Sequence, residues 1–94
     1  MKSEIDKEFF ERADAYITLA NEQAANVNRG KVSASMMFAT ARFNAWVSAS
    51  GTDSSDELAS VREEALTYFV NEYRQMLEEN LDEYIEHFDD YMKA

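Results

Sequence analysis

Residues 27–46, VNRGKVSASMMFATARFNAW, decide how the rest of the chain must fold. An Asn-Arg-Gly-Lys group opens the stretch, and the apolar residues that follow it occupy nearly every side of a helix. A helix that is apolar all round is typical of the middle of a fold, where other helices cover it. With Ser33 as a natural N-cap, we expect this helix to span residues 33–50 and to be the central one.

The segment before this stretch shows the pattern of an amphipathic helix. Its apolar residues recur three and four positions apart, so a first helix is expected over residues 4–27, with Ser3 as its cap. The chain contains only two glycines and no proline, so its glycines mark its turns. Gly30, or alternatively Asn28, is expected to end the first helix in the left-handed backbone conformation.

The segment after Gly51 predicts a third and longer helix. Ser54 and Glu57 have the spacing of a capping box, and the three-four pattern of apolar residues then continues, which predicts a helix over residues 55–93. Asn80 could cap a further helix, so a break at residues 78–81 is left open. The sequence therefore predicts one all-α domain over residues 1–94, with three helices, or four if the break is present.

The third helix is longer than its expected neighbours. At 1.5 Å per residue it would measure about 60 Å, against about 36 Å for the first helix and 27 Å for the second. The apolar stripe of its C-terminal part must therefore be covered by a returning segment or by a second copy of the chain, and we expect a homodimer. This stripe consists of Met76, Leu77, Leu81, Tyr84, Ile85 and Phe88.

Composition and charge exclude several classes of function. The chain has no cysteine, which excludes disulfides, thiol catalysis and cysteine-ligated metal centres. Its 94 residues have a net charge of −10, and residues 53–94, with thirteen acids and three bases, hold all of it. Such a surface repels nucleic acids and anionic membranes, so we expect neither as a partner. A basic protein surface is the partner that the charge favours.

The expected location is the cytoplasm. The first eight residues contain alternating charges and lack the uninterrupted apolar core of a secretory signal. Residues 32–49 are the most apolar segment, but they contain Arg42 and several polar residues, so a membrane span is not expected.

Arg42 is the only charged residue inside that apolar segment. Phe38 and Trp46 lie one helical turn away on either side, so the guanidinium could rest against both rings while it donates to a carboxylate. A structural network that sets the register of two helices is the favoured interpretation, and a ligand pocket is the functional alternative. The candidate residues are Asp14, Asn21, Arg42 and Asn44.

The turn before the second helix is the best candidate for an anion site. It brings two cations and two serines close to the free backbone N–H groups at a helix N-terminus, where anions bind favourably. The simpler alternative is a turn whose cations stay solvated. The residues of this candidate site are Arg29, Lys31, Ser33 and Ser35.

Metal binding and catalysis are not expected. Glu79, Glu83 and His87 are four residues apart, but a di-metal helical bundle needs a Glu three positions before its His, and Tyr84 stands there. The sequence shows no catalytic triad order and no glycine-rich phosphate loop. We therefore expect no cofactor, no catalytic residue and no enzymatic activity.

Three blocks of the chain resemble a family of small proteobacterial proteins of unknown function. They are FFERADAYITLANEQ, RGKVSASMMFATARFNAW and YRQMLEENLDEYIEHF. The resemblance implies an all-helical bacterial cytosolic protein and implies no activity, cofactor or site. From the residues themselves, we expect a non-enzymatic protein-interaction module that forms a homodimer. The alternative is a small-anion binder that uses Arg42 or the turn from Arg29 to Ser35.

Overall fold

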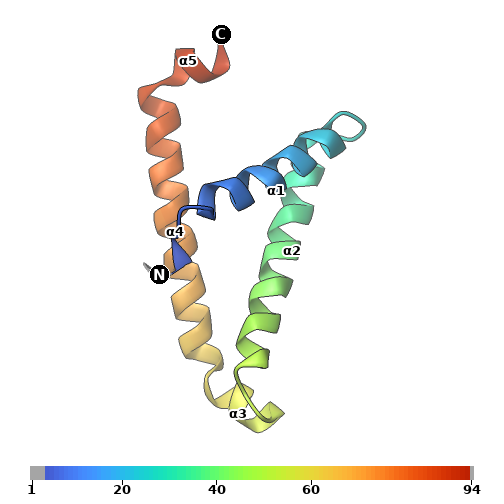
Figure 1. Ribbon diagram of the computed structural model, residues 1–94, viewed down its shortest axis with the longest axis vertical. Helices are drawn as coiled ribbons and strands as arrows, with labels where there is room; N and C mark the ends of the chain where they lie inside the picture. The colour runs from blue at the N-terminus through green and yellow to red at the C-terminus, as the bar shows by residue number, and fades with distance from the viewer. Residues whose placement is uncertain (1–3, 94) are drawn as a thin grey trace. The chain divides into compact units, whose positions relative to one another are not determined.

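The computed structural model describes residues 4–93, and within them the backbone forms helices and no β-strand. Figure 1 shows the chain and labels its helices. The described helices are α1 (Phe9–Ala24), α2 (Arg29–Ser50), α3 (Ser55–Ser60), α4 (Arg62–Glu86) and α5 (Phe88–Met92). The predicted all-α class is confirmed. The predicted count differs, because three of these helices are long and two are short.

The chain divides into two units at the second of its glycines. The first unit, Met1–Gly51, contains α1 and α2, which contact each other. The second unit, Thr52–Ala94, contains α3, α4 and α5, and both short helices contact α4. The sequence correctly marked Gly51 as a boundary, because α2 ends immediately before it.

Helix α1 begins later than the sequence predicts, at Phe9 rather than at residue 4. The turn before it is held by Asp6, whose carbonyl accepts the Phe9 N–H at 3.1 Å and whose carboxylate accepts from the Arg12 guanidinium at 2.9 Å. These two bonds hold the turn at the start of the helix, and the Glu8 side chain makes no capping hydrogen bond. The predicted cap, Ser3, lies outside the described residues.

Helix α2 begins earlier than predicted, so the assignment of Ser33 as its N-cap is wrong. Asn28 is the cap: its backbone is extended, and its side-chain oxygen accepts the Lys31 N–H at 3.0 Å. Gly30 lies inside the first turn, and no described residue has a positive φ, so the predicted left-handed turn is also absent. A Cβ on Gly30 would lie 3.1 Å from the Asn28 side-chain oxygen, so glycine leaves room for the cap.

The second unit begins as the sequence predicts. The Ser54 hydroxyl accepts the Glu57 N–H at 3.1 Å, which confirms this cap. The helix that follows is interrupted after 6 residues at Val61, whose φ of −105° and ψ of 6° leave the helical region. No glycine or proline marks this first interruption in the sequence.

The possible break at residues 78–81 is not formed, because α4 is continuous there. Asn80 does not cap a new helix: its side-chain amide donates to the Met76 carbonyl at 2.7 Å and stays within α4. The second interruption falls at His87 instead, where φ is −116° and ψ is 34°.

Very little of the described chain is buried. Val32, 7% exposed, is the only buried residue among residues 4–93, so its contact with α1 leaves most of α2 exposed. The central position that the composition of α2 predicts stays a prediction. Phe38 and Trp46 of α2 are 67% and 62% exposed. The described helices include none that is long and apolar enough to cross a bilayer. The apolar faces of a folded helical protein need a cover, and neither unit by itself supplies one for most of its apolar residues.

Candidate interaction surface

Helix α4 has apolar residues on more than half of its circumference. At 3.6 residues per turn, all of them except Tyr68 lie within an arc of about 200°. One neighbouring element covers a stripe of about 100°. The arc of α4 is thus wide enough for two neighbours on different sides.

The structure separates this arc into two flanks. Ala65, Phe69 and Met76 form a half-buried flank. About 100° around the helix, a second flank is exposed, with values that range from 42% for Leu77 to 59% for Val70. We call this exposed flank the α4 seam. It consists of Leu66, Val70, Tyr73, Leu77, Leu81 and Tyr84.

The predicted C-terminal stripe overlaps with the α4 seam only in part. Leu77, Leu81 and Tyr84 belong to both, whereas Met76 lies on the half-buried flank. Ile85, 73% exposed, lies at the edge of the seam, and Phe88 belongs to α5.

Sequence reasoning missed Leu66 and Val70. The predicted stripe began at Met76. Before that residue, two parallel apolar series have the same three-four spacing, one through Ala65 and Phe69 and one through Leu66 and Val70. Where apolar residues are this dense, spacing alone cannot say which series is covered.

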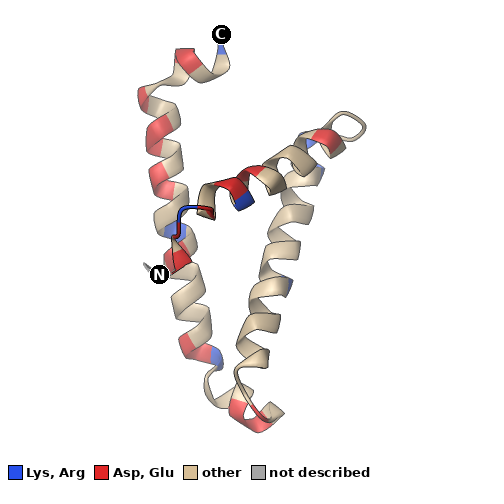
Figure 2. Cartoon of the chain, viewed as in Figure 1, with Lys and Arg blue, Asp and Glu red and all other residues tan. Residues whose placement is uncertain are grey.

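The side of α4 opposite the seam is acidic. Figure 2 shows the carboxylates along this helix and the scarcity of cations there. Glu64, Glu79 and Asp82 form no ion pair with a described residue, while Arg62 and Arg74 are engaged by Glu63 and Glu78. We call Glu64, Glu79, Asp82 and Glu86 the acidic face of α4. Because no cation neutralises most of it, this face can attract a basic partner.

The four residues of the predicted Arg42 network do not meet in the single chain. Arg42 and Asp14 are exposed, Asn21 is exposed and Asn44 is half-buried. Within residues 4–93, no side-chain hydrogen bond or ion pair joins them. Among residues 4–93, no contact joins Arg42 to an aromatic ring, and the Trp46 ring lies beside Phe43, with ring centroids 5.7 Å apart. The network remains a prediction for a state in which Arg42 gains a partner.

The candidate anion site is altered by the early start of α2. Arg29 and Lys31 lie in the first turn, but the Asn28 side chain already accepts the Lys31 N–H that an anion would use. Ser33 and Ser35 are exposed and lie further along the helix, away from its free N–H groups. A shallow hollow remains beside Arg29. Its lining consists of Ala24, Val27, Asn28, Arg29 and Gly30.

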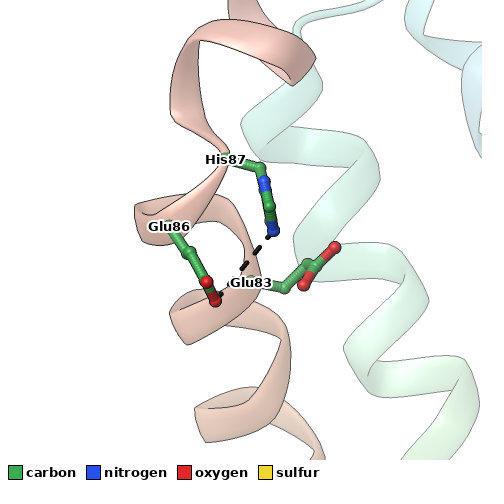
Figure 3. Close-up of side chains that lie close together, drawn as sticks. All are labelled: Glu83, Glu86 and His87. Carbon is green, nitrogen blue, oxygen red and sulfur yellow. Dashed lines mark ion pairs between the residues drawn. The ribbon is translucent and has the colours of Figure 1, made fainter.

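A carboxylate–histidine group lies where α4 ends (Figure 3). The ligand atoms of Glu83, Glu86 and His87 all lie within 4.8 Å of one another, and all three residues are exposed. The His87 Nε2 is 4.0 Å from a Glu86 oxygen, and its Nδ1 is 3.6 Å from Asp90. The sequence grouped Glu79 with Glu83 and His87 and missed Glu86. By residue type the group could hold a divalent ion such as Zn²⁺. The expectation that the protein has no metal remains a prediction.

Tyr91 closes the junction between α4 and α5. Its hydroxyl donates to a Glu83 carboxylate oxygen at 2.8 Å, and its ring lies 4.5 Å from that of Tyr84. The hydrogen bond to Glu83 raises the pKa of Tyr91, because the ionised phenol would lose it and face the carboxylate. Glu83 already accepts this hydrogen bond. The contacts of Tyr91 with Glu83 and Tyr84 therefore favour a structural role for the junction.

Comparisons with known proteins agree with the helical fold. A family model described as "Protein of unknown function (DUF3144)" matches residues 9–85. In structure the chain is similar to the protein NB7890A from Shewanella sp, which was determined by NMR. The two share 37% sequence identity over 94% of each chain, with a TM-score of 0.78. None of the curated proteins compared with the chain matches it.

Proposed function

We propose that this chain, which belongs to the DUF3144 family of proteins of unknown function, is a non-enzymatic protein-interaction module that works as a homodimer. The family supports the identity of the domain and supplies no activity. What supports the proposal is one arrangement on α4: an uncovered apolar seam on one side and an unneutralised acidic face on the other. The seam suits association between copies, which would complete a helical bundle, and the acidic face suits a basic protein.

The two sides of α4 would have different roles in recognition. Apolar area supplies most of the free energy of a stable interface. Charges on an exposed rim mainly raise the association rate and discriminate between partners. An acidic face that points away from the dimer contact stays free for a second protein, so a homodimer would offer two such faces.

Affinity capture from a bacterial lysate tests the acidic face. The protein is immobilised and retained proteins are compared at low and high salt, since salt shortens the range of electrostatic attraction. The same experiment is run with a variant that neutralises part of the face. This variant carries Glu79→Gln, Asp82→Asn and Glu86→Gln.

A matched control neutralises three acids of the first unit instead, with Glu8→Gln, Glu11→Gln and Glu22→Gln. We expect a basic protein that the original chain and the control retain at low salt, and that the α4 variant or high salt releases. Retention that is equal for both variants would refute the acidic face as a binding surface.

Light scattering on a gel-filtration peak tests the homodimer, which a mass of 10.8 kDa would rule out.

The second candidate function is small-anion binding, and the hollow beside Arg29 is the observation that favours it. A thermal-shift experiment with phosphate and sulfate tests this function. A site that is occupied at about 100 times its dissociation constant adds about 2.7 kcal/mol to stability. A rise that is lost in Arg29→Ala but kept in Arg42→Ala would locate the anion at the turn. The absence of any rise would leave the interaction module as the only proposal.

A further inference from the structure

We infer that two copies of the chain join through their α4 seams, with the two α4 helices antiparallel. This inference rests on the homodimer of the proposed function and adds which surface joins the copies and in which direction. The occupant of the seam is a second copy of α4.

The spacing of the seam is that of a helix–helix contact. Its six residues follow one another in steps of four, three, four, four and three, close to the alternation that keeps one stripe facing a partner helix. From Leu66 to Tyr84 the seam is about 27 Å long. All six residues are leucine, valine or tyrosine, which pack without leaving a buried charge.

The seam is self-complementary when the helices run in opposite directions. Its midpoint falls between Tyr73 and Leu77, so a two-fold axis there sets Tyr73 of one copy opposite Leu77 of the second. The same axis sets Val70 opposite Leu81 and Leu66 opposite Tyr84. Each tyrosine then faces a leucine, and the same patch serves both copies, as a two-fold contact requires.

Charge selects the antiparallel direction. The C-terminal half of α4, residues 75–86, holds five acids and no base, whereas both of its arginines lie in the N-terminal half. Parallel helices would bring Glu78 and Glu83, which lie on either side of the seam, close to the same residues of the second copy, and like charges repel. Antiparallel helices set each acid-rich half against an arginine-containing half. The acidic face lies opposite the seam and stays in water.

The exposed side chains of the seam are the surface that a second helix would cover. Leu66, Val70 and Tyr73 are 45%, 59% and 49% exposed. Leu77, Leu81 and Tyr84 are 42%, 52% and 45% exposed. Each Å² of apolar surface that a partner helix removes from water contributes about 25 cal/mol.

Cysteine cross-linking tests the seam and its direction together, because the natural chain contains no cysteine. Two single-cysteine variants, Tyr73→Cys and Leu77→Cys, are distinguished by an added mass tag on one of them, mixed, and oxidised mildly in their folded state. Gln75→Cys is the matched control, since residue 75 lies on the opposite side of α4. Far-ultraviolet circular dichroism verifies that each variant keeps its helices.

We expect the mixed disulfide between residues 73 and 77 to form at least about ten times faster than either disulfide between identical positions, and the control to stay unlinked. Faster linkage between identical positions would refute the antiparallel direction. Linkage of the control at a similar rate would refute the seam, yet a dimer by light scattering would leave the proposed homodimer standing. A mass of 10.8 kDa for the original chain would refute both, and would mean that another protein or the chain itself covers the seam.

Discussion

Helices α2 and α4 are similar in length, with 22 and 25 residues, but they differ in how they distribute charge. Helix α2 carries three cations, no carboxylate, and apolar residues on nearly every side. Helix α4 carries eight carboxylates and two arginines, and most of its carboxylates lie away from its apolar seam. The composition of α2 predicts the more buried helix, yet only one of its residues is buried and none of those in α4.

The difference teaches that apolar composition and burial are separate properties. Composition says how much a helix gains when it is covered, about 25 cal/mol for each Å² of apolar surface. It does not say which molecule provides the cover. For α4 the segregation of charge leaves one uninterrupted apolar side, which a helix of the same kind can match. For α2 no single side is distinguished, so its surface alone does not point to one neighbour.

The largest effect is expected from a charge placed in the α4 seam. Leu77→Glu would bury a carboxylate without a partner in the middle of the proposed contact, at a cost of about 3 kcal/mol or more. The dissociation constant of the dimer should therefore rise by a factor of at least about 100. Analytical ultracentrifugation over a range of concentrations measures it. Gln75→Glu, on the opposite side of α4, is the control and should leave the constant unchanged within about twofold.

A smaller effect is expected from the one buried side chain of α2. Val32→Ala removes two methyl groups from a site that is 7% exposed and should lower the free energy of unfolding by about 2 kcal/mol. Val47→Ala in the same helix is the control and should cost less than about 0.5 kcal/mol, since Val47 is 43% exposed. Urea denaturation measures both. Equal costs would show that the exposed side of α2 is covered in solution.

The N-cap of α2 should have a smaller effect again. Asn28→Ala removes the acceptor of the Lys31 N–H and should lower the free energy of unfolding by about 1 kcal/mol. Ser33→Ala should change it little, because Ser33 is exposed and lies inside the helix. Thermal denaturation of the two variants compares them. A larger loss for Ser33→Ala would contradict the observed start of α2.

The smallest change in stability is expected when the pH falls through the pKa of Asp6, in the turn before α1. The hydrogen bond from Arg12 lowers the pKa of Asp6 below its ordinary value. A carboxylate whose pKa falls on folding stabilises the folded state above its unfolded pKa, and this contribution disappears as the pH falls through its folded pKa. An NMR titration of the Asp6 carboxyl group measures the shift. The pKa should return toward its ordinary value in Arg12→Gln, and an unchanged pKa in that variant would contradict the assigned cause.

Local signals in the sequence predicted most of the helical structure. The cap at Ser54 and the boundary at Gly51 depend on a few neighbouring residues, and both are confirmed. The same kind of signal was available at Asn28, since asparagine is a strong N-cap. Val27 and Val32 also occupy the two positions of a hydrophobic staple around it. Ser33 was preferred because glycine was expected to lie in the turn, whereas Gly30 lies inside the helix.

The interruptions of the second unit were not predictable in the same way. Asn80 has the residue type of a cap, but its amide bonds within α4, because the helix continues on both sides of it. Val61 and His87 have no special preference for leaving a helix. At His87, the interruption coincides with the contacts of Tyr91 with Glu83 and Tyr84, which link residues about two turns apart.

The sequence by itself determined the helical class, the acidic second half, the boundary at Gly51 and the cap at Ser54, because each depends on residues close together in the chain. Only the tertiary structure decided where the last two helices separate and which flank of α4 stays open. These depend on side chains that meet across helices, and the spacing of apolar residues is the same whether a flank is covered or exposed. The choice between the two flanks of α4 is therefore a property of packing, and it is the one on which the proposed dimer depends.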